Sequence, residues 1–424
     1  VRIGREGSCA QYGMVAAEDI AEGYCLFQVR RSSLLMPANT DIATLISKDQ
    51  VKLSATNQWV PLLISLMYEQ NCTSSRWRPY LDLVPDFEAL DLPLFWESSE
   101  VEKYLKGTGV DLAVERDLRM IESDYNNLVL PFFQRHEDHI KLQRKDFEFF
   151  KKMVAFVMAY SFTEPQGGNQ GGDDDDSEDE EGPVTSAPMM VPVADILNHV
   201  TNNNAKLTFG KEALKMVTTR AIKKGEEIYN TYGQVSNLHL MHMYGFAEPF
   251  PDNVNDVVEI PVTRLLAAAK ESTGDSDTDL LDKKWKFLVE TDVVADDDVI
   301  VLGQDGIITD DVCLETLKVL TMSGPQFADH VSKGGWSDAE SESSSSSETG
   351  LDFAKIQQLD SRWKSLLKRM GELHLEGYPT SIEEDEMRMK SAASLQPRAR
   401  YSLYVAHGQK MLLKSLLDSC GEIS

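Results

Sequence analysis

The sequence contains few cysteines, and none of them forms a closely spaced pair. Its 424 residues include five cysteines. They are Cys9, Cys25, Cys72, Cys313 and Cys420. Zinc modules need closely spaced cysteine pairs, and an odd number of scattered cysteines is a poor disulfide framework. We therefore expect a reduced intracellular protein with neither a bound metal nor disulfide bonds.

The sequence also lacks a long hydrophobic run. A transmembrane helix needs about 18 consecutive apolar residues, and no stretch approaches that length. The longest apolar stretches, 59–68 and 153–162, fit helices of a hydrophobic core. No signal-peptide pattern is visible. We expect no association with a membrane.

Positive charge is scarce. There are 42 lysines and arginines against 69 aspartates and glutamates, so the net charge is −27. Nucleic-acid binding needs a basic surface for the phosphates, so direct binding of nucleic acid is excluded. An acidic surface instead attracts a basic protein partner. Part of the acidity lies in the low-complexity stretch 166–182, which has no hydrophobic residue and predicts a disordered, solvated loop.

Hydrophobic patterning divides the chain into four alternating blocks. Residues 1–40 alternate as short strands, with a hairpin expected to turn at Gly23. Helical spacing dominates residues 41–183, strand-like alternation returns in 184–254, and 255–424 are helical again. This order predicts an α+β fold. It consists of a β-rich domain with a helical insertion, followed by an all-helical C-terminal domain.

Polar residues within hydrophobic sequence mark the first candidate site. The segment 191–199, VPVADILNH, is called the NH motif below and contains Asp195, Asn198 and His199. These side chains are expected to be buried, and buried polar groups need hydrogen-bond partners. On its own, the motif also fits a turn capped by Asn and Asp beside a core histidine.

Two further segments each place a tyrosine directly before a glycine. They are 226–233, EEIYNTYG, with Tyr232, and 242–246, HMYGF, with Tyr244. Either one alone indicates a turn at which an aromatic ring packs against bare backbone. The sequence has no GxSxG elbow, no HExxH helix and no Walker loop, so these classes of hydrolase and nucleotide-binding enzyme are not indicated.

Taken in order along the chain, these segments resemble the SET-domain protein methyltransferases. The order is a glycine-bearing segment at 12–16, the NH motif, a glycine turn at 223–228 and the two Tyr-Gly segments. The long insertion and helical C-terminal part resemble the branch of Rubisco large-subunit methyltransferase. Further segments match one lysine methyltransferase of that branch, namely 75–80, 95–96, 107–110, 159–162 and 249–253. The likeness covers essentially the whole chain.

The resemblance implies a binding site for S-adenosylmethionine between the N-terminal glycine segment and the NH motif. The implied cofactor-binding residues are Tyr12, Gly13, Met14, Ser161, Asn198, His199, Tyr244 and Phe246. The family often has an arginine after the serine, whereas this chain has Phe162. That departure puts in doubt a carboxylate-binding partner at this position.

The resemblance also implies that Tyr244 and Tyr232 are the catalytic tyrosines, and that Tyr232 and Asp195 contact the substrate. In this reaction a lysine amine attacks the methyl group of a sulfonium. The amine must first be neutral, although a free lysine has a pKa of about 10.4. An apolar channel and a nearby positive charge both lower that pKa. A tyrosine hydroxyl can then align the amine for in-line transfer.

The implied substrates are proteins, and the implied compartment is the nucleus. The resembled lysine methyltransferase is associated with a transcription-factor subunit of the NF-κB type and with a histone variant, and it suggests mono-methylation. Residues 255–424 would bind the protein substrate, with its target lysine in a basic context. Two alternatives stay open. The chain could methylate a histidine, as relatives in this branch do, or it could be a non-enzymatic protein-binding module.

Overall fold

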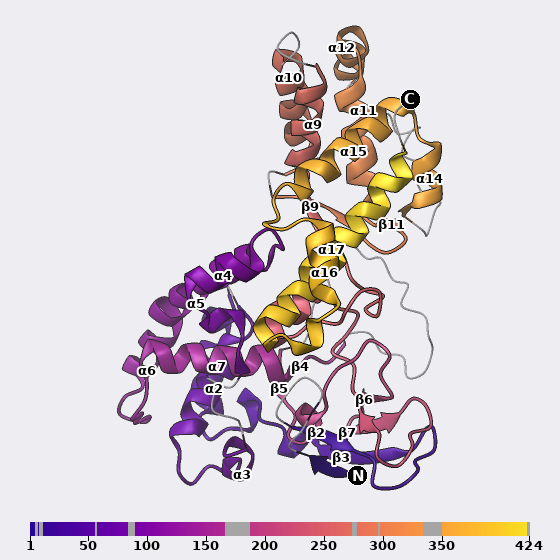
Figure 1. The fold of residues 1–424 in the computed structure, drawn as a ribbon. Helices are drawn as coiled ribbons and strands as arrows, with labels where there is room; N and C mark the ends of the chain where they lie inside the picture. The colour runs from indigo at the N-terminus through magenta and orange to yellow at the C-terminus, as the bar shows by residue number, and fades with distance from the viewer. Residues whose placement is uncertain are drawn as a thin grey trace. The chain divides into compact units, whose positions relative to one another are not determined.

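The computed structural model describes residues 1–4, 7, 12–55, 57–83, 90–165, 187–273, 278–295, 297–333 and 350–421. The acidic loop predicted at 166–182 lies outside these residues. The chain folds into two compact units, which Figure 1 shows coloured along the sequence. The first unit comprises Val1–Trp96, Leu112–Gln234 and His242–Gly245, and the second comprises Glu97–Asp111, Val235–Met241 and Phe246–Ser424.

The strands of the first unit form small antiparallel sheets. One sheet has the order β1-β2-β8, a second has the order β3-β7-β6, and β4 pairs with β5. The bounds are β1 (Arg2–Gly4), β2 (Gly13–Val15), β3 (Cys25–Arg30), β4 (Ser161–Phe162), β5 (Met189–Met190), β6 (Ala205–Phe209), β7 (Ala213–Thr218) and β8 (Glu227–Ile228). The strand-like alternation predicted in residues 1–40 and 184–254 is confirmed.

The hairpin predicted to turn at Gly23 is wrong. Gly23 does turn the chain, with φ at 74°. However, β2 pairs with β8, through Met14 opposite Ile228, whereas β3 pairs with β7 in the other sheet. Met14, Ile228 and the buried residues of β3 and β7 share one hydrophobic core. Strands β2 and β3 therefore each contribute to that core by pairing with a strand far along the chain.

The helical insertion is confirmed, and most of it packs in the first unit. Its helices are α1 (Ala43–Leu53), α2 (Val60–Asn71), α3 (Arg78–Leu81), α4 (Ser98–Leu105), α5 (Val110–Asp124), α6 (Leu130–Arg135) and α7 (Phe147–Tyr160). Short turns are η1 (Arg31–Ser33), η2 (Pro37–Asn39), η4 (Pro93–Phe95) and the π-turn η5 (Tyr125–Val129). Helix α2 packs against α7 through buried apolar side chains of both helices (Figure 1). Asp146 caps α7 by accepting a hydrogen bond from the Phe149 amide at 3.0 Å.

The second unit contains a four-stranded sheet, so the prediction that the C-terminal domain is all helical is wrong. The strands are β9 (Val258–Pro261), β10 (Val299–Leu302), β11 (Gly306–Ile307) and β12 (Leu351–Asp352), in the order β12-β11-β10-β9. β-branched residues alternate between buried and less buried positions in β9 and β10, which is the two-residue period of a strand. The α+β class itself is confirmed.

Helices surround this sheet. They are α9 (Thr263–Thr273), α10 (Thr278–Glu290), α11 (Asp310–Thr321), α12 (Gly324–Ser332), α14 (Phe353–Gln358), α15 (Ser361–Leu375), α16 (Ile382–Met389) and α17 (Pro397–Cys420), with the turn η8 (Ala392–Ser394). Helix α15 packs against α9 and α17, and Leu367, Met370 and Leu413 are fully buried in this core. Within the described ranges, no helix is both long and apolar enough to cross a membrane.

Candidate active site

The N-terminal glycine segment meets the NH motif in the first unit. Asn198 donates hydrogen bonds from Nδ2 to the carbonyl of Tyr12 at 3.0 Å and to Oε1 of Glu227 at 2.6 Å. Gly13 lies against the same groups. A Cβ atom on Gly13 would stand 2.6 Å from Glu227 Oε1 and 3.3 Å from Asn198 Nδ2. A side chain at position 13 would have to displace the Glu227 carboxylate from Asn198, so Gly13 allows β2 and this hydrogen-bonded pair to lie close together.

Glu227 and Asn204 complete this cradle, and neither was predicted as a site residue. The second carboxylate oxygen of Glu227 accepts a hydrogen bond from the Tyr229 hydroxyl at 3.2 Å. Asn204 donates to the Glu227 carbonyl at 2.9 Å and accepts from the Tyr229 amide at 2.7 Å. Alternation along β8 and the residue after it places Glu227 and Tyr229 on one face. This alternation was the sequence signal that could have indicated that the two side chains lie together. The acceptor role of Glu227 depends on Asn198, which is distant in sequence.

Of the two predicted catalytic tyrosines, Tyr232 lies beside His199 and Tyr244 lies beside Tyr232. The amide of Tyr232 donates to His199 Nδ1 at 3.0 Å, and the two rings stack with centroids 5.1 Å apart. The hydroxyl of Tyr232 donates to the Leu197 carbonyl at 3.1 Å. The ring centroids of Tyr232 and Tyr244 are 4.5 Å apart. The structure therefore joins the end of the NH motif to both Tyr-Gly segments.

Burial sets the protonation of this aromatic cluster. It lowers the pKa of His199 to about 4, so the imidazole is neutral at pH 7. A neutral ring with an accepting Nδ1 agrees with the hydrogen bond from the Tyr232 amide. Burial also raises the pKa of Tyr244 to about 12. The Tyr244 phenol therefore keeps its proton at neutral pH, which suits alignment of a substrate better than removal of its proton.

The two Tyr-Gly pairs are also turns, as their composition indicates. Gly233 and Gly245 have φ angles of 112° and 76°, which glycine adopts without strain. A Cβ on Gly245 would lie 3.3 Å from the carbonyl of Asp91. Tyr244 is the last residue of α8 (Asn237–Tyr244). Two residues earlier, His242 Nε2 lies 2.9 Å from Asp117 Oδ2, which fixes the end of α8 to α5.

The NH motif contains the 3₁₀ turn η6 (Ala194–Ile196), and the Asp195 side chain points to the helical insertion. Its Oδ2 accepts a hydrogen bond from the Tyr80 hydroxyl at 2.5 Å. Val193, just before the turn, has φ at 77° and ψ at −40°. This is an unusual conformation for a β-branched residue. The role of Asp195 in substrate binding stays a prediction, and its contact with Tyr80 was not foreseen.

The remaining predicted residues fall into three environments. Ser161 directly follows α7 and pairs with Met190 between β4 and β5. The side chain of Met14 is buried in the β core, which leaves its main chain to contact a ligand. Phe246 belongs to the second unit, where its ring centroid lies 6.3 Å from that of Tyr401. That Phe246 lies against the cofactor stays a prediction.

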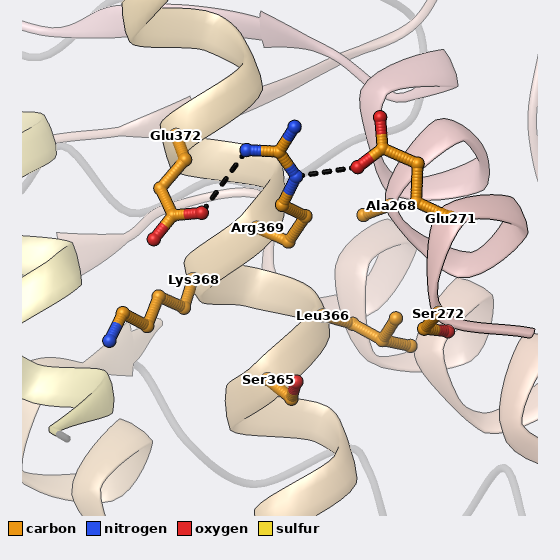
Figure 2. Close-up of a pocket in the computed structure, with 8 residues that line it drawn as sticks. All are labelled: Ala268, Glu271, Ser272, Ser365, Leu366, Lys368, Arg369 and Glu372. Carbon is orange, nitrogen blue, oxygen red and sulfur yellow. Dashed lines mark hydrogen bonds and ion pairs between the residues drawn. The ribbon is translucent and has the colours of Figure 1, made fainter. Parts of the chain in front are cut away.

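A separate hollow lies in the second unit between α9 and α15, as Figure 2 shows. It has a volume of about 370 Å³, and none of the predicted site residues lines it. Arg369 pairs with Glu271 at 2.6 Å and Glu372 at 3.2 Å (Figure 2) and with Glu376 at 3.0 Å. The charged groups thus satisfy one another. Among the described residues, no group of three or more metal-ligating side chains is placed to hold a metal ion.

Comparison with known proteins agrees with this geometry. Residues 11–233 match the family model of the SET domain, and residues 275–413 match that of the Rubisco LSMT substrate-binding domain. The N-lysine methyltransferase setd6 of Danio rerio is 43% identical over 98% of this chain and 90% of its own length. The chain belongs to the setd6 family of SET-domain N-lysine methyltransferases. The Homo sapiens family member, SETD6, is 39% identical over 99% of this chain and 86% of its own length.

Solved structures of much lower sequence identity have the same fold. The structure of Rubisco LSMT bound to AdoMet aligns with a TM-score of 0.64 at 17% identity, and covers 98% of this chain and 86% of that one. The SET domain of LSMT bound to lysine and AdoHcy aligns with a TM-score of 0.63 at the same identity and coverage. At this identity the likeness shows the fold of the setd6-family chain.

Proposed function

We propose that this chain transfers one methyl group from S-adenosylmethionine to a lysine side chain of a nuclear protein, such as an NF-κB-type transcription-factor subunit or a histone variant. The single observation that carries the proposal is the cluster of a buried histidine and two partly buried tyrosines at the end of the NH motif. There His199, Tyr232 and Tyr244 stand together, and the Tyr232 hydroxyl contacts the Leu197 carbonyl. The curated relatives named N-lysine methyltransferase support the reaction class.

The residues at Gly13 fit the cofactor. The space that a Cβ would fill is bounded by Asn198 and Glu227, so bare backbone faces these polar groups. Tyr12, Gly13 and Met14 would hold the cofactor through their main chain, together with Asn198 and His199. Ser161 would lie on the same side. When bound, S-adenosylmethionine supplies a methyl group on a positively charged sulfur and leaves as S-adenosylhomocysteine.

The side chains of the cluster position the lysine amine and keep it neutral. A neutral His199 and two aromatic rings stabilise an ammonium less than water does. The pKa of the amine is therefore lowered, and the amine loses its proton to solvent more easily. The Tyr244 hydroxyl keeps its own proton, and its oxygen can accept a hydrogen bond from the amine. Tyr232, fixed by Leu197 and His199, forms a wall beside it. The catalytic gain is mainly one of orientation.

Charge and domain composition support the choice of substrate. The net charge of −27 favours encounter with a basic partner, such as the tail of a chromatin protein. The second unit matches the family model of a substrate-binding domain. These observations favour a protein substrate whose target lysine lies among basic residues. We propose the nucleus as the compartment, because the resemblance implies nuclear substrates.

The first experiment measures transfer of labelled methyl from S-adenosylmethionine to proteins of a nuclear extract. Wild type is compared with Tyr244→Phe and with Tyr125→Phe. The control removes a hydroxyl that donates only to the Lys145 carbonyl on the surface. We expect labelled bands with wild type and Tyr125→Phe, and about 100-fold less label with Tyr244→Phe. Acid hydrolysis of the bands should yield monomethyl-lysine.

Three other outcomes of this experiment would change the proposed function. Methyl-histidine in the hydrolysate would replace lysine by histidine as the target. Cofactor binding without any transfer would favour the protein-binding module. A folded wild-type chain that does not bind S-adenosylmethionine would refute the methyltransferase proposal.

A further inference from the structure

One buried hydrogen bond joins the helical insertion to the NH motif within the first unit. Tyr80 on α3 donates its hydroxyl to Asp195 Oδ2 at 2.5 Å, across 115 positions of sequence. Asp195 is only 8% exposed. The Tyr80 ring lies 6.1 Å from that of Phe156 on α7. A bond between a phenol and a buried carboxylate is stronger than most neutral hydrogen bonds.

The turn that carries Asp195 is closed by its own backbone hydrogen bonds, and Ala194 and Leu197 are buried in the β core. Its backbone hydrogen bonds run from 3.1 to 3.4 Å, among them Ala194 to Val191 and Leu197 to Ala194. Val193 immediately before it has the positive φ described above. A strained conformation of this kind persists only when the surroundings hold it in place. At 2.5 Å the bond from Tyr80 is shorter than each of these backbone hydrogen bonds, and it comes from outside the motif.

The turn leads directly into the candidate active site. Leu197, two residues after Asp195, offers the carbonyl that accepts the Tyr232 hydroxyl. Tyr80 is also linked to the other side of the site, because Phe156 contacts Tyr160 at 5.6 Å and Ser161 follows in sequence. A displacement of Asp195 would therefore move the Leu197 carbonyl.

We propose that Tyr80 and Asp195 form a positioning pair, through which the helical insertion fixes the Leu197 carbonyl and the NH motif for methyl transfer. The inference rests on the proposed function. Neither residue needs to touch substrate or cofactor in this role. The pair acts through Leu197 and Tyr232, so its loss should lower kcat by misplacing groups that are themselves intact.

The pair should respond to pH near neutrality. Burial raises the pKa of Asp195 to about 7, and the Tyr80 hydroxyl pulls it in the opposite direction. The other contributions come from the backbone amides of Asp195 and Val193, and Tyr160 is the remaining titratable group that acts on Tyr80. The ionised carboxylate accepts the hydrogen bond more strongly than the acid does. The turn is therefore held most firmly above about pH 7.

The test compares full-length wild type with Tyr80→Phe, Asp195→Asn and the control Tyr125→Phe. Two readouts are measured: amide hydrogen exchange of residues 193–199, and the pH profile of kcat for the band labelled most strongly in nuclear extract. We expect Tyr80→Phe to speed exchange and to lower kcat, each by about tenfold, which corresponds to one lost hydrogen bond. In Tyr80→Phe the change of kcat near pH 7 should move to higher pH, because the Asp195 carboxylate loses a hydrogen-bond donor.

Asp195→Asn separates positioning from folding. Asparagine still accepts from Tyr80 but cannot ionise, so in this variant kcat should no longer change with pH through residue 195. In this variant the change of kcat near pH 7 should vanish. The change of kcat that is due to ionisation of the substrate lysine should remain in every variant. Folding is checked by circular dichroism.

The positioning pair would be overturned if Tyr80→Phe showed the same amide hydrogen exchange and the same kcat as Tyr125→Phe. An unchanged pH limb in Asp195→Asn would also overturn it. Should wild type transfer no methyl group to any protein, the proposed function fails. The exchange measurement still decides whether Tyr80 holds the turn.

Discussion

At the scale of single residues, the absence of a side chain at Gly13 is as informative as the side chains around it. Gly13 closes the contact between β2 and Asn198, and a methyl group there would collide with Glu227. We expect Gly13→Ala to weaken S-adenosylmethionine binding about tenfold in calorimetry, because the added methyl group displaces the Glu227 carboxylate from Asn198. Gly4→Ala is the matched control, since its Cβ would meet nothing closer than 3.8 Å. Equal affinity of both variants would contradict this role.

A second residue-scale prediction concerns pH and stability at Asp195. Its folded pKa of about 7 lies above the unfolded value of about 3.9. The folded state therefore holds the extra proton, and its stabilising effect is lost as pH rises from about 4 to 7. His199 acts oppositely, since its pKa is lowered to about 4 and stability rises with pH up to about 6.5.

Replacing Asp195 isolates its share of this dependence. We expect Asp195→Asn to gain stability relative to wild type between pH 4 and 7.5, by up to a few kcal/mol at the upper end. Urea unfolding followed by circular dichroism at several pH values measures the difference. Asp138→Asn, at an exposed position, provides the control. A difference between Asp195→Asn and wild type that does not change with pH would show that Asp195 ionises alike in both states.

Much of the site was visible in the sequence at this scale. The NH motif and the two Tyr-Gly segments supplied Asn198, His199, Tyr232 and Tyr244, and the structure places them in two adjoining groups. Tyr80 gave no such signal. Its role comes from a contact across 115 positions, and a lone tyrosine in a helical segment looks the same whether or not a distant carboxylate lies beside it.

At the scale of elements, the sequence predicted helix and strand better than it predicted pairing. Helix α7 has apolar residues at helical spacing, and they are buried together with the whole run Met153–Met158. Strands β11 and β12 have two residues each, too few for any period to emerge. The partner of β2 is set by the shared core with β8, which lies more than 200 residues later. Short strands and distant partners were therefore the two sources of error.

Helices α16 and α17 are joined by a buried ion pair that allows a sharp test. Lys410 donates to Asp385 Oδ2 at 2.6 Å and to the carbonyl of Thr380 at 2.7 Å, and both charged side chains are only 1% exposed. We expect Asp385→Ala to destabilise the protein by about 3–5 kcal/mol, because it leaves a buried ammonium without its counter-charge. Urea unfolding monitored by circular dichroism measures the loss.

Two comparisons control this result. Asp329→Ala breaks an exposed pair with Lys333 and should cost less than about 1 kcal/mol. The double replacement Asp385→Leu with Lys410→Met should recover most of the stability, since apolar side chains need no charged partner. If the double variant is as unstable as Asp385→Ala, packing by these side chains and not the unpaired charge determines the stability of this region.

At the scale of the whole molecule, the dominant feature is the net charge of −27. It is too large to come from the segment 173–181 alone, so the rest of the chain is acidic as well. Such a charge acts over distances of about 10 Å at moderate salt, and it speeds the approach of a basic partner more than it stabilises the final complex. Composition alone predicts this property, because net charge does not depend on which residues pair.

The resulting prediction concerns salt. For a substrate peptide with basic residues around the target lysine, KM should rise about tenfold between 50 and 300 mM salt, while kcat stays nearly constant. Steady-state kinetics at saturating S-adenosylmethionine measures both constants. A matched peptide with glutamine at the basic flanking positions should show little change in KM. If both peptides respond alike, the acidity of the chain serves solubility, and selection of the substrate lies in the uncharged contacts of the lysine site.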